Sequence, residues 1–372
     1  MKKRILQVIP TLDRAGAEKQ LALLAARLPV DEFDVHVCAL TRGGPLLGDL
    51  EQAGIPATVI GKRWKIDPQA FFRLTRFIRN WEPDLIHTWI FAANAYGRAA
   101  GMWCNVKCLV AGERCVDPWK GSRDLAVDRY LARRTARIVT NSSGVKEFYS
   151  ARGLPAEKFV VIPNGILPPK PSTTPREVLL EELGLPPNSR LIGLVGRLWA
   201  QKRVNDAIWA ADLLKRVRND THLLILGDGP LRDRLRRFRD KVEIRDRVHF
   251  LGHRDDAWRI LPHFDVVWST SAYEGQSNAI MEAMAHGIPV VATDIAGTRD
   301  LVVPDVTGRL VSAAKADAER RRATFAKHTQ QILEDPELAA RMGGAARNRV
   351  ATEFTVDKMV EAHVRLYREL LP

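Results

Sequence analysis

The chain has 372 residues, of which 46% are hydrophobic and 27% are charged. This composition is typical of a soluble globular enzyme and excludes a disordered or fibrous chain, and the length predicts about two domains. No stretch approaches the roughly 20 apolar residues that span a bilayer, so we expect a cytoplasmic protein without a transmembrane anchor.

The net charge of +13 is uneven along the chain. Residues 1–168 carry 25 Lys and Arg against 16 Asp and Glu, and the remaining residues carry 32 against 28. This excess predicts an anionic surface or substrate for the first half. The four cysteines are too few for a disulfide framework. A zinc site of Cys104, Cys108, Cys115 and His87 fits no standard spacing, so we expect reduced thiols.

Residues 1–168 repeat one pattern, in which a short apolar run is followed by a loop and a helical stretch. Most of the runs are continuously apolar, as parallel strands covered on both faces are. The predicted strands are 4–9, 34–40, 57–61, 84–89, 107–112, 137–142 and 159–165.

A proline-rich stretch, 166–177, predicts a linker, after which the same alternation begins again. The second set of predicted strands is 190–197, 222–227, 247–252, 265–270 and 289–294. Two such arrays indicate an α/β protein of two Rossmann-like, doubly wound domains, 1–168 and 175–354, facing each other across a cleft. The segment 355–372 contains one amphipathic helix that begins at a Thr355 cap.

Ligands of such sheets bind at the carboxyl ends of the strands, and three loops there are unusual. Arg197 and Lys202 lie close enough to converge on one anion, and their donors suit a diphosphate. Gly227 and Gly229 permit close backbone approach in 226–235, without a full dinucleotide fingerprint. Taken singly, the first loop is better explained by two solvated cations, and the second is explained equally well by a plain tight turn.

The third loop has one carboxylate before a predicted helix and one inside it. Ser277 or Asn278 caps this helix, which ends at Gly287. Backbone N–H groups at its start attract phosphate, while Glu274 and Glu282 can accept hydrogen bonds from a polyhydroxylated ligand. Exposed acids are the ordinary interpretation of either glutamate alone, but three such loops together favour a binding site.

Several motifs, in the same order, resemble the retaining family 4 glycosyltransferases. They are "IVTNSSGVKEFY", "VIPNG", "LVGRLWAQKR", "LLILGDGP", "VHFLGHRDD" and "EGQSNAIMEAMAHGIPVVATDIAG". The resemblance covers essentially the whole chain. It implies the GT-B fold, with the donor bound by the second domain, the acceptor mostly by the first, and a C-terminal helix that packs back on the first domain.

The same resemblance implies a role for individual residues. Arg197 and Lys202 would hold the diphosphate of a UDP- or GDP-linked sugar, Glu274 the transferred sugar, and Glu282 the ribose. The backbone of Gln276, Ser277 and Asn278 would meet the phosphates, and Gly16, Gly227 and His253 complete the expected donor site. No metal and no cofactor are implied, because these cations and a helix start supply a positive field.

The first half departs from the family pattern. Ala15 precedes Gly16 where a glycine pair is usual, and Glu113 and Arg114 stand where many members have a histidine. We therefore expect Glu113 or Arg114 to assist the acceptor hydroxyl or the donor phosphate. His87 and Asn94, in a stretch similar to O-antigen and other cell-surface polysaccharide branches, are further acceptor-side candidates.

The same fold is compatible with other functions. A nucleotide-sugar epimerase or hydrolase of the same fold, and a non-catalytic nucleotide-sugar binding protein, are the alternatives. A phosphorylase would need a lysine that binds pyridoxal, and no motif in the sequence indicates one. No nucleic-acid module is recognisable, so no nucleic-acid partner is expected.

The segment 62–81 combines six Lys and Arg with helical apolar spacing. Its apolar residues are expected to face the core of an ordinary Rossmann helix. Its charges predict reversible, salt-sensitive binding to the anionic inner face of the membrane, where a saccharide or lipid-linked saccharide acceptor would reside.

Overall fold

The computed structural model describes the backbone of residues 1–372 and every side chain except that of Lys315. The chain forms two compact units. The first comprises Met1–Gly165 and Val356–Pro372, and the second comprises Ile166–Thr355.

The first unit is built on a seven-stranded parallel sheet with the order β3-β2-β1-β4-β5-β6-β7. Its strands are β1 (Lys3–Thr11), β2 (Phe33–Arg42), β3 (Ala57–Val59), β4 (Leu85–Trp89), β5 (Cys108–Glu113), β6 (Arg137–Thr140) and β7 (Phe159–Val161). β1 and β4 are neighbours at the point where the strand order reverses, which is where doubly wound sheets bind ligands.

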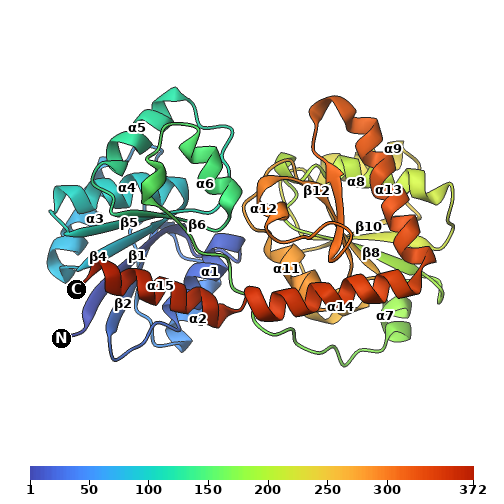
Figure 1. The fold of residues 1–372 in the computed structure, drawn as a ribbon, viewed down its shortest axis with the longest axis horizontal. Coiled ribbons are helices and arrows are strands. Elements are labelled where there is room, and N and C mark those ends of the chain that lie inside the picture. The colour runs from blue at the N-terminus through green and yellow to red at the C-terminus, as the bar shows by residue number, and fades with distance from the viewer. The chain divides into compact units, whose positions relative to one another are not determined.

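Helices cover both faces of this sheet (Figure 1). α1 (Gly16–Ala25), α2 (Leu46–Gln52) and α15 (Val356–Leu370) contribute to the core on one face, together with alternate residues of β1 such as Ile5 and Ile9. α3 (Pro68–Trp81) and α4 (Ile90–Trp103) form the core on the other face, with Leu6 and Val8. The remaining helices are α5 (Ser122–Ala132), α6 (Ser143–Ser150) and the 3-10 helix Ala156–Lys158.

The second unit has a six-stranded parallel sheet with the order β10-β9-β8-β11-β12-β13. Its strands are β8 (Arg190–Val195), β9 (Thr221–Leu226), β10 (Val248–Gly252), β11 (Val266–Ser269), β12 (Val290–Asp294) and β13 (Gly308–Ser312). The strand order again reverses between two central neighbours, β8 and β11.

The helices of the second unit alternate with its strands. They are α7 (Arg176–Glu182), α8 (Val204–Lys215), α9 (Arg232–Lys241), α10 (Ala257–Ile260), α11 (Asn278–Ala285), α12 (Ala296–Arg299), α13 (Ala318–Glu334) and α14 (Pro336–Glu353), with 3-10 turns at Ala200–Lys202, Leu261–His263 and Lys315–Asp317.

All twelve predicted strands are present, with ends that differ by up to four residues. β13 was not predicted, because this short edge strand has a half-buried Arg309 and no long apolar run. The predicted C-terminal helix is α15, and it packs in the core of the first unit. Among the described residues, no helix has both the length and the apolar character that crossing a bilayer requires.

Candidate active site

Two loops meet at the carboxyl ends of the central strands of the second unit. The loop after β8 includes the 3-10 turn Ala200–Lys202, and the loop after β11 leads to α11. Three hydrogen bonds join them: Thr270 Oγ1 donates to the Lys202 carbonyl at 2.7 Å, the Ala272 amide to the Gln201 carbonyl at 2.7 Å, and Gln201 Nε2 to the Tyr273 carbonyl at 2.7 Å. The two predicted motifs are therefore held as one structure.

An ion pair between Lys202 and Glu274 connects the same two loops through their side chains. Lys202 Nζ donates to Glu274 Oε1, and the Ser271 hydroxyl donates to the same oxygen. The Glu274 side chain is 10% exposed and that of Lys202 is 22% exposed. A partly buried carboxylate with two donors is held in a defined orientation. Because both donors use Oε1, they leave Oε2 for a ligand.

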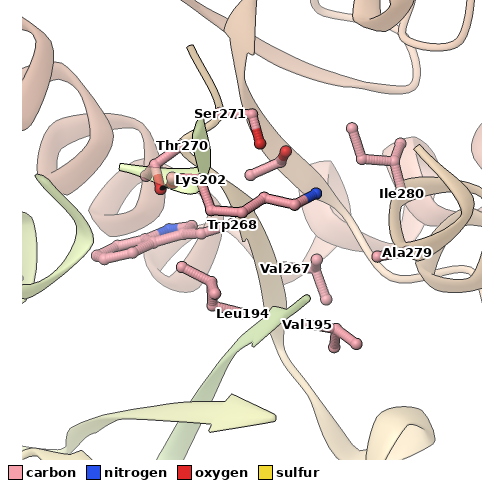
Figure 2. Close-up of a pocket in the computed structure, with 10 residues that line it drawn as sticks. Leu194, Val195, Lys202, Val267, Trp268, Thr270, Ser271, Ala279 and Ile280 are labelled. Atoms are coloured by element: carbon pink, nitrogen blue, oxygen red, sulfur yellow. Dashed lines mark hydrogen bonds between the residues drawn. The ribbon is translucent and has the colours of Figure 1, made fainter. Parts of the chain in front are cut away.

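A small pocket lies at this junction (Figure 2). Figure 2 shows the Lys202 side chain extending across it, with Ser271 on one side and Ala279 and Ile280 of α11 on the other. The complete lining is Leu194, Val195, Lys202, Val267, Trp268, Ser269, Thr270, Ser271, Ala279 and Ile280. The pocket thus presents a single ammonium group above an apolar floor formed by the strands.

Close backbone approaches explain the glycines of the loops. A Cβ atom on Gly227, where φ is +140°, would lie 2.0 Å from the Gly196 carbonyl oxygen, so a side chain cannot be accommodated there. A Cβ atom on Gly297 would lie 1.8 Å from the carbonyl oxygen of Gly275, the residue after Glu274. The Leu198 amide also donates to the Asp228 carbonyl at 2.9 Å. The predicted loop 226–235 therefore packs directly against the loop that carries Lys202.

The other cation predicted at this site, Arg197, lies in the same loop as Lys202. Its side chain is exposed, and it has no ion pair within the described part of the chain. Gln276 and Ser277 are buried. Ser277 occupies the N-cap position of α11, although its hydroxyl does not bond to the first turn. The predicted cap is therefore right in position and wrong in its side-chain hydrogen bond.

The remaining donor-side candidates are more dispersed. Asn278 is the first residue of α11, and Glu282 lies on its second turn; both are half-buried. α11 ends before Gly287, which has a φ of +72°, as predicted. His253 is exposed after β10, with Nε2 3.5 Å from Asp255 Oδ1. Gly16 is exposed at the start of α1, in the first unit.

In the first unit, Glu113 ends β5 inside a buried ionic cluster. Lys120 Nζ lies 3.3 Å from Glu113 Oε1, 3.0 Å from Asp128 Oδ2 and 3.7 Å from Asp117 Oδ2. Arg98 Nη2 donates to Asp128 Oδ1 at 2.7 Å. Burial raises the pKa of the Glu113 carboxyl to about 7, against the opposing effect of Lys120. Burial therefore brings the titration of the Glu113 carboxyl close to neutral pH.

Arg114, the next residue, is a buried cation without a carboxylate partner. Its Nη2 donates to Asn164 Oδ1, and the guanidinium lies 4.9 Å from the centre of the Trp89 ring. Nε and Nη1 are buried and have no hydrogen-bond partner among the described residues. Burial lowers the pKa of Arg114 to about 9. The side chain therefore retains donors that an anionic group could use.

His87 lies in the middle of β4 and contacts α15. Its Nδ1 is 2.7 Å from the Tyr367 hydroxyl, and its ring centre is 5.7 Å from that of His363. Burial holds the pKa of His87 well below its usual value, and the neighbouring His363 and Arg114 act in the same direction. His87 is thus a neutral, fully buried side chain that contacts the C-terminal helix.

Asn94 is also fully buried and joins two strand ends. Its Nδ2 donates to the Gly112 carbonyl at 3.0 Å, and its Oδ1 accepts from the Thr88 hydroxyl at 2.7 Å. The carbonyl of Asn94 accepts from Arg98 Nε at 2.7 Å. Asn94 therefore orients the backbone just before Glu113 and reaches the ionic cluster through Arg98.

Sequence reasoning missed Ser271 and the partners of Glu113. Ser271 had a signal, since a small polar residue stands between an apolar strand and Glu274. Lys120, Asp128 and Arg98 had none, because they come from a loop and two helices that only the topology brings together. Cys104, Cys108 and Cys115 are free thiols, and the described residues contain no cluster of three or more His, Cys, Asp or Glu side chains suited to a metal ion.

Two family models match the chain, one in each half. Residues 14–168 match the model described as Glycosyltransferase Family 4, and residues 175–349 match the model described as Glycosyl transferases group 1. These matches confirm the resemblance found in the sequence motifs.

Two relatives cover most of the chain. An Escherichia coli UDP-Gal:alpha-D-GlcNAc-diphosphoundecaprenol alpha-1,3-galactosyltransferase is 26% identical, over 98% of this chain and 96% of that one. A Mycobacterium tuberculosis glycogen synthase is 29% identical, over 78% and 69%.

The fold of Anabaena HepE, solved in complex with UDP-glucose, superposes with a TM-score of 0.86 at 24% identity, over 98% of this chain and 99% of that one. Two parallel Rossmann-like units, two family models and this full-length likeness lead to one conclusion. The chain belongs to the family 4 glycosyltransferases of the GT-B fold, and it is an enzyme of the hexosyltransferase class.

Proposed function

We propose that this enzyme transfers a sugar, with retention of anomeric configuration, from a UDP-linked donor to a saccharide or lipid-linked saccharide in cell-surface polysaccharide or glycoconjugate synthesis. The activity of the E. coli relative, a galactosyltransferase that uses UDP-Gal and a diphosphoundecaprenol-linked acceptor, supports a UDP-sugar donor and a diphosphate-lipid acceptor. The complex of HepE supports a UDP-sugar ligand for this fold.

The observation that carries the proposal is the Lys202–Glu274 ion pair at the carboxyl ends of β8 and β11. Transfer leaves a nucleoside diphosphate carrying the negative charge of the broken glycosidic bond. A preorganised ammonium group stabilises such charge most where water is excluded, and Lys202 is mostly buried. Arg197 belongs to the same loop and adds a second cation for the diphosphate.

Glu274 is assigned to the hydroxyls of the transferred sugar. Ser271 and Lys202 both donate to Oε1, which orients the carboxylate so that Oε2 can accept from a sugar hydroxyl. Glu282 would accept from the ribose, and the backbone of Gln276, Ser277 and Asn278 at the start of α11 would contact the phosphates. Gly16, Gly227 and His253 are assigned to the surroundings of the donor.

The first unit is proposed to bind the acceptor and the second the donor. Glu113, with a pKa near neutrality, is suited to exchange a proton with an acceptor hydroxyl. The unpartnered donors of Arg114 are suited to an anionic group. His87 and Asn94 would support these two side chains, because both are fully buried and Asn94 bonds to the Gly112 carbonyl, next to Glu113.

We further propose that transfer requires no metal ion and no cofactor, since Lys202, Arg197 and the start of α11 can neutralise a departing diphosphate. The enzyme would work in the cytoplasm, at the inner face of the membrane, where a lipid-linked acceptor resides.

The test is a panel of nucleotide sugars with two measurements on each. A rise in the thermal midpoint identifies the donor, and release of the nucleoside diphosphate without acceptor shows that the glycosidic bond is broken. We expect one UDP-sugar to give both signals. A thermal shift without release, even with acceptor extracts present, would favour a non-catalytic binding protein, and interconversion of the sugar without release would favour an epimerase.

A further inference from the structure

Four large hydrophobic side chains of the first unit are exposed on its surface. The exposed fractions are 69% for Trp64, 81% for Ile66, 61% for Phe72 and 61% for Trp103. Single exposed hydrophobic residues are normal in soluble proteins. Four on neighbouring elements, two of them tryptophans, indicate a surface that is covered in use.

Specific contacts connect the elements that carry these four side chains. The Phe71 ring lies 6.1 Å from the Phe72 ring and 6.3 Å from the Trp103 ring, so it connects α3 to the end of α4. The loop before α3 is attached to α4 through Tyr96, whose hydroxyl accepts from the Asp67 amide at 2.6 Å and donates to the Lys65 carbonyl at 3.3 Å.

Figure 1 shows α3 and α4 side by side on one face of the first sheet. We call the surface formed by Lys62–Ile66, Phe72, Arg76 and Trp103 the aromatic–basic face.

The same face is strongly cationic. Residues 62–81 contain six Lys and Arg and a single acid, Asp67. That acid is 4% exposed and is occupied as the N-cap of α3, where its side chain accepts from the Ala70 amide. Arg63, Lys65 and Arg76 are exposed. The positive charge of this surface is therefore not balanced by an acid within the segment.

The arrangement differs from the sequence expectation in one respect. The apolar stripe of α3 is directed to the core, with Leu74 and Ile78 fully buried, as an ordinary Rossmann helix requires. The exposed hydrophobic residues come instead from the preceding loop, from the opposite side of α3 and from α4. A purely electrostatic attachment therefore does not account for this surface, because exposed apolar side chains lie among the cations.

We propose that the aromatic–basic face docks on an anionic membrane, with Trp64, Ile66, Phe72 and Trp103 at the level of the lipid headgroups and the neighbouring Lys and Arg on lipid phosphates. Tryptophan is enriched at membrane interfaces because its ring is apolar and its N–H is polar. Cations near an anionic leaflet add attraction that salt screens. An anionic membrane can bind the apolar side chains and the cations at the same time. This inference rests on the proposed function, in which the acceptor is linked to a lipid.

The experiment is sedimentation of the full chain with vesicles, which does not depend on turnover. Mixed phosphatidylglycerol–phosphatidylcholine vesicles are compared with pure phosphatidylcholine, each at low and high salt. We expect binding to the anionic vesicles that weakens with salt and keeps a salt-resistant part. Each neutralised cation should weaken low-salt binding about fivefold, so Arg63→Ala with Arg76→Ala should remove most of the salt-sensitive part.

Trp64→Ala with Phe72→Ala should instead remove the salt-resistant part, by at least about tenfold. The matched controls lie in the second unit: the exposed Trp258→Ala, and Arg236→Ala with Arg237→Ala on α9, should bind like the parent. Absence of binding to anionic vesicles at low salt would overturn the proposal, as would unchanged binding by both double variants. Self-association that Trp64→Ala abolishes, without any vesicle binding, would assign the face to a second copy of the chain.

Nucleotide release in the absence of vesicles separates this inference from the proposed function. We expect the double variants of the aromatic–basic face to release nucleotide like the parent. If the parent itself releases no nucleotide, the proposed function is contradicted. The vesicle experiment would still decide whether the aromatic–basic face binds a membrane.

Discussion

Lys202 and Glu274, separated by 72 residues in the chain, form an ion pair across two loops at the carboxyl ends of neighbouring strands. Neither side chain is fully exposed, so the pair resists screening better than a surface salt bridge does. A donor that places its diphosphate at Lys202 and its sugar at Glu274 would use both partners of one prearranged pair. In the proposed function, the pair would therefore couple recognition of the leaving group to recognition of the transferred group.

Removal of either cation of the β8 loop should impair transfer. We expect Lys202→Ala and Arg197→Ala each to cost about 2–4 kcal/mol of transition-state stabilisation, because an electrostatic donor to the departing diphosphate is lost. The measurement is kcat/KM for nucleotide release. Arg216→Ala, an exposed cation just after α8, is the matched control. Turnover near that of the parent in both site variants would refute the assignment.

Ser271 should act as a positioning residue for Glu274. Ser271→Ala removes a hydrogen bond to a partly buried carboxylate, and we expect kcat to fall about 5–30-fold, in line with about 1–2 kcal/mol. Ser271→Thr keeps the hydroxyl and should restore most of the activity. The measurement is the steady-state kinetics of both variants, and the thermal midpoint shows whether each is folded. Equal kcat values in Ser271→Ala and Ser271→Thr would show that the hydroxyl does not orient Glu274.

Glu113 and Arg114 should contribute to catalysis from the first unit. We expect Glu113→Gln or Arg114→Ala to lower turnover at least about tenfold, because a neutral amide cannot exchange a proton and alanine cannot bind an anion. The control for folding is the thermal midpoint with and without donor. If both variants turn over like the parent, the group lies elsewhere, and His87→Ala is the next variant to measure.

Chelation should leave activity unchanged. We expect the enzyme to keep its turnover after treatment with EDTA, because the side-chain cations and the start of α11 are proposed to neutralise the leaving diphosphate. The assay is nucleotide release before and after chelation, with magnesium and manganese added back. Full loss that either ion restores would contradict metal-independent transfer.

Acidification should destabilise the first unit through its buried histidines. Burial lowers the pKa of His363 to about 3, and the unfolded side chain titrates near 6.5. The unfolded state therefore binds a proton that the folded state does not, so stability present above pH 6.5 is lost as pH falls. Integration gives a loss of about 2 kcal/mol from His363 alone by about pH 5.

Urea unfolding at about pH 7.5 and about pH 5 measures this loss. We expect His363→Gln to show a smaller loss than the parent, whereas exposed His253→Gln should behave like the parent. His87, whose pKa is also depressed by burial, should act in the same direction. An equal pH dependence in the parent and His363→Gln would show that His363 is not buried in its neutral form.

Most of the secondary structure was predictable, because parallel strands covered on both faces leave long apolar runs between loops. β13 was not predicted, because an edge strand that contains Arg309 need not form an apolar run. The donor loops were also predictable, because Arg197, Lys202, Glu274 and Glu282 lie in distinctive motifs at strand ends. The acceptor-side surroundings were not, because Glu113 meets Lys120 and Asp128 only after β5, a loop and α5 have packed together.

The sequence by itself determined the fold class, the family and the residues that stand at the ends of the strands, because periodicity, glycine positions and motif order are local properties. Only the tertiary structure decided which groups meet. It placed Lys202 and Ser271 on one oxygen of Glu274, buried His87 against Tyr367 of the C-terminal helix, and turned Trp64 and Phe72 outward beside α4. These contacts join residues far apart in the chain, and their burial depends on packing that no local pattern encodes.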